Sequence, residues 1–303
     1  MTVTANKLYS IDNSSRVGGE YEKLEREFFS MIRLNGKINK TTWANRLIDV
    51  DESLEHYIRQ QGLTPIEYLD VGVSSGISTW DWYKALTTSG RPFRLTATDL
   101  VLEAFLMPVG YHLQVLVDRY GAPLQYDFLG YGIRPGRPRP RDWVTGIVLA
   151  SLIVALAYKK RCREIGLGCE EMGTRRDCSI ALKAQSNVRL VRLISPRLPD
   201  SVAIDFVESD VLRPPSENMQ NRFDVVRVAN LLNADYFSHQ QMKTICRQLK
   251  RYMVGPNSLL VICRTREDGS NHGTIFRLSS TAHLVPVRRL GEGSEIEELV
   301  VQA

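Results

Sequence analysis

Short apolar runs recur along this chain, and most of them end close to an acidic residue or a glycine. Continuous apolar runs of about four to eight residues are typical of strands that are buried on both faces of a sheet. The runs that predict strands are Ile66–Val71, Phe93–Asp99, Val202–Asp210, Phe223–Asn230, Ser258–Cys263, Thr274–Leu278 and Glu297–Val301, with His283–Val287 extending the last hairpin.

Segments with apolar residues three and four positions apart lie before and between these runs and predict helices. They cover residues 21–32, residues 47–58, a segment through Trp80 and Leu86, and His239–Tyr252. The chain has 303 residues, of which 43% are hydrophobic, so it can bury a large core around one sheet. We therefore expect a mixed α/β protein with one main domain.

The first strand runs into the turn Asp70-Val-Gly72-Val-Ser74-Ser-Gly76. Glycines allow a tight turn, and a strand that enters a helix through such a turn directs free backbone N–H groups at a ligand. A dinucleotide fingerprint needs Gly-x-Gly-x-x-Gly, and the third glycine is missing here. The turn instead resembles motif I of the class I S-adenosylmethionine-dependent methyltransferases, with Ser74 in place of the middle glycine.

This resemblance implies a Rossmann-like fold: a seven-stranded, mostly parallel sheet with helices on both faces and a reversed final strand. It also implies S-adenosylmethionine as cofactor, with Asp99 on the ribose hydroxyls and Asp210 on the adenine amino group. The resemblance adds Asp70, Gly72, Ser74, Gly76 and Asn230 to the donor-binding set. Residues 1–62 are expected to form a helical extension that acts as a lid over the donor or as a buttress on the sheet, and residues 63–303 the methyltransferase domain.

Two asparagines, Asn230 and Asn233, follow the fourth strand, where the family places residues beside donor and acceptor; the alternative is that they cap or turn the chain. No nucleophile motif is present, and methyl transfer does not need one. The candidates for a catalytic base are Asp235, Tyr236 and His239.

A long insertion, residues 101–200, follows the second strand, where the family needs only one helix. It contains an apolar helix over residues 143–158, which carries no charge and lies between basic segments. Sixteen residues at about 1.5 Å each span about 24 Å, less than the hydrocarbon core of about 30 Å. A single crossing of the membrane by this helix would also place strands of one sheet on opposite sides of the bilayer. Three interpretations remain: a membrane-interface or re-entrant anchor, a partner or dimer interface, and a buried helix.

Charge is concentrated around this helix. Residues 134–163 hold eight lysines and arginines against one acid, Asp142, while the whole chain has a net charge of +5. Basic residues on both sides of an apolar helix attract anionic lipid, so we expect a cytoplasmic protein that is peripheral on the inner face of a membrane. Nucleic acid is disfavoured because no aromatic residues alternate with the basic ones.

Five cysteines lack Cys-x-x-Cys spacing, which is typical of a reducing compartment. The spacing of Cys162, Cys169 and Cys178 is irregular for a zinc site completed by a histidine, so we expect no bound metal. The sequence thus predicts a methyltransferase whose acceptor is unidentified and is expected to be lipid-linked or amphiphilic. The alternatives are a noncatalytic membrane adaptor on the same scaffold, whose donor pocket would be blocked by side chains, and a nicotinamide-dependent oxidoreductase.

Overall fold

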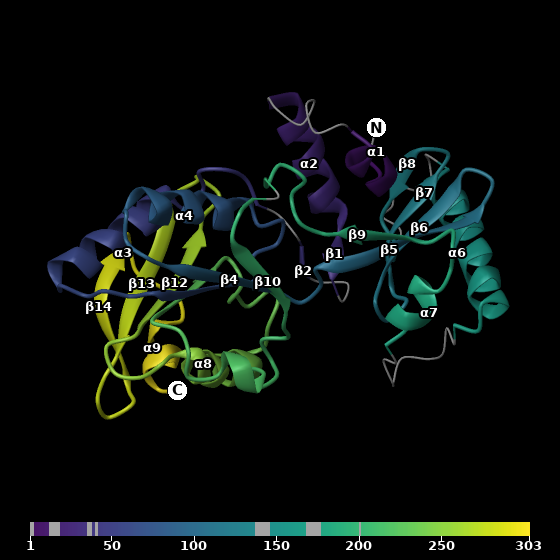
Figure 1. The fold of residues 1–303 in the computed structure, drawn as a ribbon. Helices are drawn as coiled ribbons and strands as arrows, with labels where there is room; N and C mark the ends of the chain where they lie inside the picture. Colours follow the sequence, from purple (N-terminus) through teal and green to yellow (C-terminus); the bar gives the residue numbers. More distant parts are fainter. Residues whose placement is uncertain are drawn as a thin grey trace. The chain divides into compact units, whose positions relative to one another are not determined.

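The computed structural model describes residues 3–11, 19–34, 38–39, 42–136, 146–167, 177–199 and 201–303. The chain divides into two compact units (Figure 1): unit 1 comprises Met1–Thr41 and Val101–Arg197, and unit 2 comprises Thr42–Leu100 and Leu198–Ala303. This division separates residues that the sequence grouped as one extension over 1–62.

Unit 2 is built on a seven-stranded sheet in the order β10-β4-β3-β11-β12-β13-β14. The strands from β10 to β12 are parallel, and β13 is antiparallel to both of its neighbours. The strands are β3 (Glu67–Val71), β4 (Arg94–Asp99), β10 (Ile204–Glu208), β11 (Val225–Ala229), β12 (Leu259–Thr265), β13 (Asn271–Leu278) and β14 (Leu284–Leu290). The predicted fold class, a mostly parallel seven-stranded α/β sheet, is confirmed.

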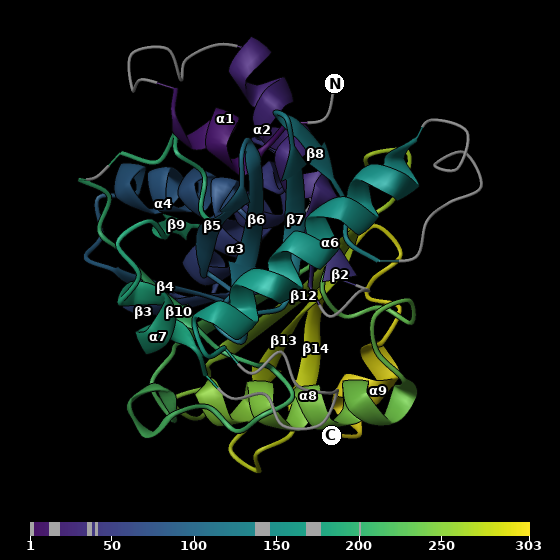
Figure 2. The ribbon, with the colours of Figure 1, turned by 90° about the vertical axis from the view of Figure 1, so that its right-hand side faces the viewer.

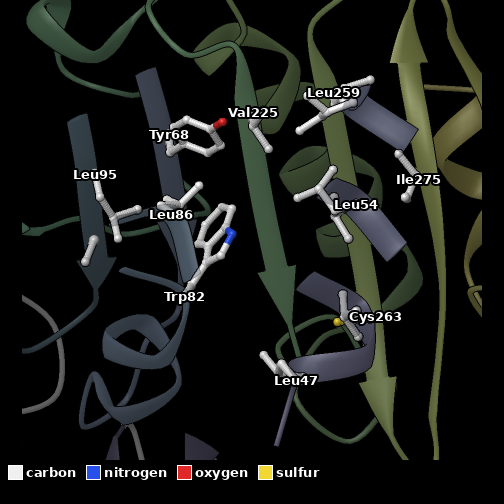
Figure 3. Close-up of a cluster of buried hydrophobic side chains, with 14 of the residues drawn as sticks. Leu47, Leu54, Tyr68, Trp82, Leu86, Leu95, Val225, Leu259, Cys263 and Ile275 are labelled. Carbon is white, nitrogen blue, oxygen red and sulfur yellow. The ribbon is translucent and has the colours of Figure 1, made fainter. Parts of the chain in front are cut away.

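Helices cover both faces of this sheet (Figure 1). The elements are α3 (Ile48–Gln60), α4 (Ile77–Thr88), α8 (His239–Tyr252) and α9 (Glu297–Val301), with a short 3₁₀ turn at Glu217–Met219. Leu54 of α3 and Trp82 and Leu86 of α4 pack on one face against strand residues such as Tyr68 and Val225 (Figure 3). The sheet therefore has a continuous apolar core beneath the turn that follows β3.

The end of the chain differs from the prediction. Glu297–Val301 forms helix α9 and not a strand, because Leu299 and Val300 are buried while α9 contacts α8 and β14. The sheet ends instead with β14, which includes Arg288 to Leu290. The reversed strand is consequently β13, the second to last.

Unit 1 contains a second, wholly antiparallel sheet of five strands in the order β8-β7-β6-β5-β9. The strands are β5 (Glu103–Gly110), β6 (Leu113–Asp118), β7 (Pro123–Phe128), β8 (Tyr131–Ile133) and β9 (Arg189–Arg192). The other elements are α1 (Ala5–Tyr9), α2 (Gly19–Met31), α6 (Ile147–Glu164), α7 (Ser179–Lys183) and the short pair β1 (Arg33–Leu34) and β2 (Ile38–Asn39).

The N-terminal segment is held to the insertion by polar contacts. The Gln125 side chain accepts a hydrogen bond from the backbone of Ala5 at 2.9 Å and donates one to the carbonyl of Val3 at 2.8 Å. Arg197 forms ion pairs with Glu22 and Glu25 of α2. The insertion and the N-terminal segment therefore form one body.

Helix α6 runs from Ile147 to Glu164, so it covers residues 147–158 of the predicted helix and extends six residues beyond it. Gly146 precedes the helix as its N-cap, and residues 143–145 lie outside the described residues. It packs on β5, β6 and β7, as Figure 2 shows. Burial is restricted to one side of the helix, so the interpretation as a fully buried helix is wrong. In the described part of the chain, no helix is long and apolar enough to cross a membrane.

Candidate functional site

The order of the strands changes direction between the neighbouring strands β3 and β11 of the parallel sheet. From β3 the chain continues to β4 on one side, and it returns later to β11 on the other side. In open α/β sheets, ligands bind outside the carboxyl ends of the strands at such a point. The turn after β3 and the segment after β11 both lie there.

The turn after β3 has a left-handed backbone at Gly72, Ser74 and Gly76, with φ values of 76°, 59° and 78°. Its N–H groups are used within the protein. Gly72 and Val73 donate to the carbonyl of Thr98 at 2.7 and 3.1 Å, and Gly76 donates to Val73 at 2.9 Å. The expectation of free N–H groups is wrong for these residues, because β4 and the turn itself supply acceptors.

Ser74 and Asp99 are in direct contact. The Ser74 N–H donates to Asp99 Oδ2 at 2.6 Å, so the carboxylate at the end of β4 holds the turn in place. The Asp99 carbonyl accepts from the N–H of Ser209 at 2.9 Å, next to Asp210. Asp210 is half-buried, and its Oδ1 accepts from the N–H of Leu212 at 3.0 Å. The predicted ribose carboxylate, Asp99, thus ends β4, and the predicted adenine carboxylate, Asp210, lies two residues after the end of the neighbouring strand β10.

Asp70 lies in the core and not on the surface of the site. Its carboxylate accepts hydrogen bonds from Arg227 of β11, at 3.1 and 2.6 Å, and from the Thr79 hydroxyl at 2.7 Å. Arg227 also donates to Asp51 of α3 at 2.5 Å and lies 4.1 Å from the ring centroid of Trp82. Asp70 therefore fixes the start of α4 and the turn before it.

The buried group of Arg227, Asp70 and Asp51 has one guanidinium for two carboxylates. Desolvation raises the pKa of Asp51 to about 7, and the attraction of Arg227 offsets only part of that rise. For Arg227, desolvation lowers the pKa, but the charges of Asp51 and Asp70 outweigh it, and the net direction is upward. Arg227 remains charged, and Asp51 is the group that takes up a proton.

Gly72 makes a close contact across the site. A Cβ atom at Gly72 would lie 2.9 Å from Cδ2 of Leu231, which follows β11. Leu231 is buried and fills the space that the glycine leaves. A side chain at position 72 would therefore clash with Leu231.

The two asparagines after β11 have different partners. Asn233 accepts hydrogen bonds from the N–H groups of Asp235 and Tyr236 at 3.0 and 3.2 Å, so it caps a turn. Asn230 has a left-handed φ of 58° and exchanges hydrogen bonds with Thr265, its Oδ1 accepting from the backbone N–H at 2.7 Å. Asn230 thus ties the end of β11 to the end of β12.

The candidate bases Asp235, Tyr236 and His239 follow this segment. The side chain of Asp235 is 81% exposed and lies 3.8 Å from Arg264, and Tyr236 is half-buried. His239 is exposed at the first position of α8, where Ser238 forms a capping box. No described hydrogen bond joins any of the three to the turn after β3.

Buried thiols of unit 2 are not nucleophiles. Desolvation raises the pKa of Cys263 to about 12 and that of Cys246 to about 11, so both stay protonated. Within the described ranges, no group of three or more histidines, cysteines or acids is placed to hold a metal ion; Cys169 lies outside these ranges.

Sequence reasoning missed Arg227 and Asp51. An arginine inside the apolar run Val225-Val-Arg-Val-Ala was the available signal, because a charged residue in a buried strand needs an acidic partner.

Comparisons with known proteins give distant structural similarities. No family model and no curated protein matches the chain. Among solved structures, the N-methyltransferase NodS from Bradyrhizobium japonicum WM9, in complex with S-adenosyl-L-homocysteine, has a TM-score of 0.32 and 12% identity over 74% of this chain and 65% of its own.

Two further structures are similar at the same level. The PH0226 protein from Pyrococcus horikoshii OT3 has a TM-score of 0.33 and 10% identity, covering 94% of this chain and 89% of its own. The citrinin polyketide synthase CMeT domain has a TM-score of 0.33 and 13% identity, covering 73% of this chain. The match spans only 35% of that synthase structure and a little under two thirds of NodS. At these scores, the fold assignment rests on the strand order and directions of the chain itself.

Proposed function

We propose that this chain is an S-adenosylmethionine-dependent methyltransferase whose donor lies at the carboxyl ends of β3, β4 and β11. The observation that carries the proposal is the contact of Ser74 with Asp99 at the point where strand order changes direction. It joins a glycine-containing turn to a carboxylate on the neighbouring strand.

The residues present suit an adenosine group. Carboxylates accept hydrogen bonds from hydroxyl and amino groups, and Asp99 and Asp210 lie at the carboxyl ends of the adjacent strands β4 and β10. Asp99 is assigned to the ribose hydroxyls and Asp210 to the adenine amino group. Asp70 is assigned to holding the turn, through Arg227 and Thr79.

When bound, the donor supplies an activated methyl group on a sulfonium. The chain then has to align the acceptor for in-line displacement and, where the acceptor carries a proton, to accept that proton. Asp235, Tyr236 and His239 are the proposed candidates for this second task. Asn230 fixes the backbone from which they extend. The acceptor class proposed is lipid-linked or amphiphilic.

The test is calorimetric titration of the chain with S-adenosylmethionine, S-adenosylhomocysteine and NAD in parallel. Micromolar binding of the two sulfur compounds and none of NAD supports the proposal, and binding of NAD alone would favour the oxidoreductase. Asp99→Asn keeps an oxygen for the Ser74 N–H, so the turn is retained while the charge is lost. We expect it to weaken donor binding at least tenfold, about 1.4 kcal/mol.

Asp205→Asn is the matched control, because Asp205 lies on β10, next to β4, and is exposed. It should bind the donor as the parent chain does. Equal affinities for the parent chain and Asp99→Asn would refute the ribose assignment.

A second candidate, a noncatalytic scaffold, is favoured by the contact of Leu231 with Gly72. It predicts that the parent chain binds no donor and that Leu231→Ala gains binding. Leu232→Ala is the control, since this neighbour is equally buried and is not among the atoms nearest a Cβ at Gly72. Donor binding by the parent chain would exclude this candidate.

A further inference from the structure

Helix α6 has two sides of different character. Val154, Tyr158 and Cys162 are buried at four-residue spacing and pack in one cluster with Phe105 and Val115 of the antiparallel sheet. The Tyr158 hydroxyl also donates to the carbonyl of Gly121. These contacts attach the helix to unit 1 and use only this side of it.

The opposite side of α6 is apolar and exposed. Leu149, Leu152, Ile153 and Leu156 are 63%, 54%, 40% and 57% exposed, respectively. Their spacing of three, one and three residues places them on a single stripe, because an α-helix turns once in about 3.6 residues. Contiguous apolar surface of this kind on a folded unit marks an interaction site.

The same stripe continues into basic residues. Lys159, Lys160 and Arg163 lie three, four and seven positions after Leu156, and all three are exposed. The one acid of the helix, Glu164, forms an ion pair with Arg161 at 3.3 Å. No carboxylate in the described part of the chain lies within ion-pair distance of Lys159, Lys160 or Arg163.

We propose that this face of α6, defined by Leu149, Leu152, Ile153, Leu156, Lys159, Lys160 and Arg163, docks unit 1 on an anionic membrane surface, with the helix lying in the plane of the interface. The leucines and isoleucine enter the boundary between headgroups and acyl chains, and the basic residues contact anionic headgroups. The inference does not depend on donor binding.

Charge complementarity selects this occupant over a second copy of the chain. A dimer through α6 would bring basic residues from both copies to the contact, and the helix offers no unpaired acid to neutralise them. Basic residues covered at a contact without an acid to pair with weaken association, whichever way the two helices run. An anionic lipid layer, in contrast, satisfies the apolar stripe and the basic end together.

The experiment is flotation of the full chain with vesicles of phosphatidylcholine alone and of phosphatidylcholine with phosphatidylserine. We expect binding to the anionic vesicles only, and reduced binding at high salt. The triple variant Leu149→Gln, Leu152→Gln, Leu156→Gln should lose it. The triple variant Lys159→Gln, Lys160→Gln, Arg163→Gln should weaken it about a hundredfold, at about fivefold for each charge.

Ile180→Gln is the control, because Ile180 lies on α7 of the same unit and is the most exposed large aliphatic residue of the described chain. Circular dichroism melting establishes whether each variant is folded. If the triple leucine variant unfolds, the triple variant of Lys159, Lys160 and Arg163 alone tests the membrane proposal. Failure of the parent chain to float with anionic vesicles would overturn the proposal. So would a dimer in sedimentation that the apolar variant dissociates while vesicle binding is unchanged.

Discussion

Arg227 and Asp70 lie directly opposite each other on the neighbouring strands β11 and β3, and the guanidinium holds both oxygens of the carboxylate. Both side chains are buried beneath the turn that follows β3. The sheet therefore carries an ionic cross-link at the centre of an otherwise apolar core. Asp51 extends it to α3, and Thr79 extends it to α4.

Replacing Arg227 with methionine should strongly destabilise unit 2. Two carboxylates would remain buried without their cation, and breaking a buried pair in this way costs about 3–5 kcal/mol. Urea unfolding followed by circular dichroism measures the loss. Arg222→Met is the control, because Arg222 pairs with Glu67 at 3.2 Å and is partly exposed; it should cost less than about 1 kcal/mol. Equal losses would contradict a special role for Arg227.

The ionic cross-link should also give unfolding a pH dependence of a definite sign. Burial raises the pKa of Asp51 from 3.8 to about 7, so the native state binds more protons than the unfolded state between these values. The contribution of Asp51 to the free energy of unfolding is largest below pH 4 and falls as the pH rises through 7.

Asp51→Asn isolates this effect, since asparagine does not titrate. Relative to the variant, the free energy of unfolding of the parent chain should fall from pH 4 to pH 7. The slope should correspond to at most one proton that the chain takes up when it folds. Chemical denaturation at a series of pH values, compared between the two chains, provides the slope. Parallel curves would mean that Asp51 is ionised throughout.

Gly72→Ala should destabilise unit 2 by two separate effects. A left-handed φ costs an alanine about 1–2 kcal/mol, and the contact with Leu231 adds a steric cost of about 1–3 kcal/mol. Gly90→Ala separates them, because Gly90 has a similar φ of 70° and nothing within 4 Å of a Cβ.

The contact itself is tested by a double-mutant cycle. Combining Gly72→Ala with Leu231→Ala should remove the steric part and leave a loss close to that of Gly90→Ala, beyond the cost of Leu231→Ala alone. If the two substitutions are additive, Leu231 does not fill the space at Gly72.

The parallel strands of unit 2 were predictable because each is a compact apolar run with a polar residue at its carboxyl end. Ile66–Val71 and Phe93–Asp99 fall on β3 and β4, and the acid that ends the second run contacts the turn that follows the first. Glu297–Val301 was not predictable in this way. Five residues are too few for periodicity to distinguish a strand from a helix, and packing on α8 decides it.

The insertion was the least predictable part. Residues 103–110 form β5 despite Glu103 and Pro108, because Pro108 lies beside a register shift in the pairing with β6. The apolar helix was found from its composition, but which of its sides is covered depends on its packing against β5, β6 and β7, which the residues of the helix alone do not specify. Arg227 and Asp51 are 176 residues apart, so only the fold brings them together.

The order of the two units along the chain has a consequence for synthesis. The first 41 residues belong to a body that is completed only at Arg197, where the arginine side chain contacts Glu22 and Glu25. Strands β3 and β4 emerge in the meantime and have to wait for β10 and β11. The last strand of the unit 1 sheet, β9, is synthesised before β10 and β11, so unit 1 can mature first while β3 and β4 still lack their later neighbours.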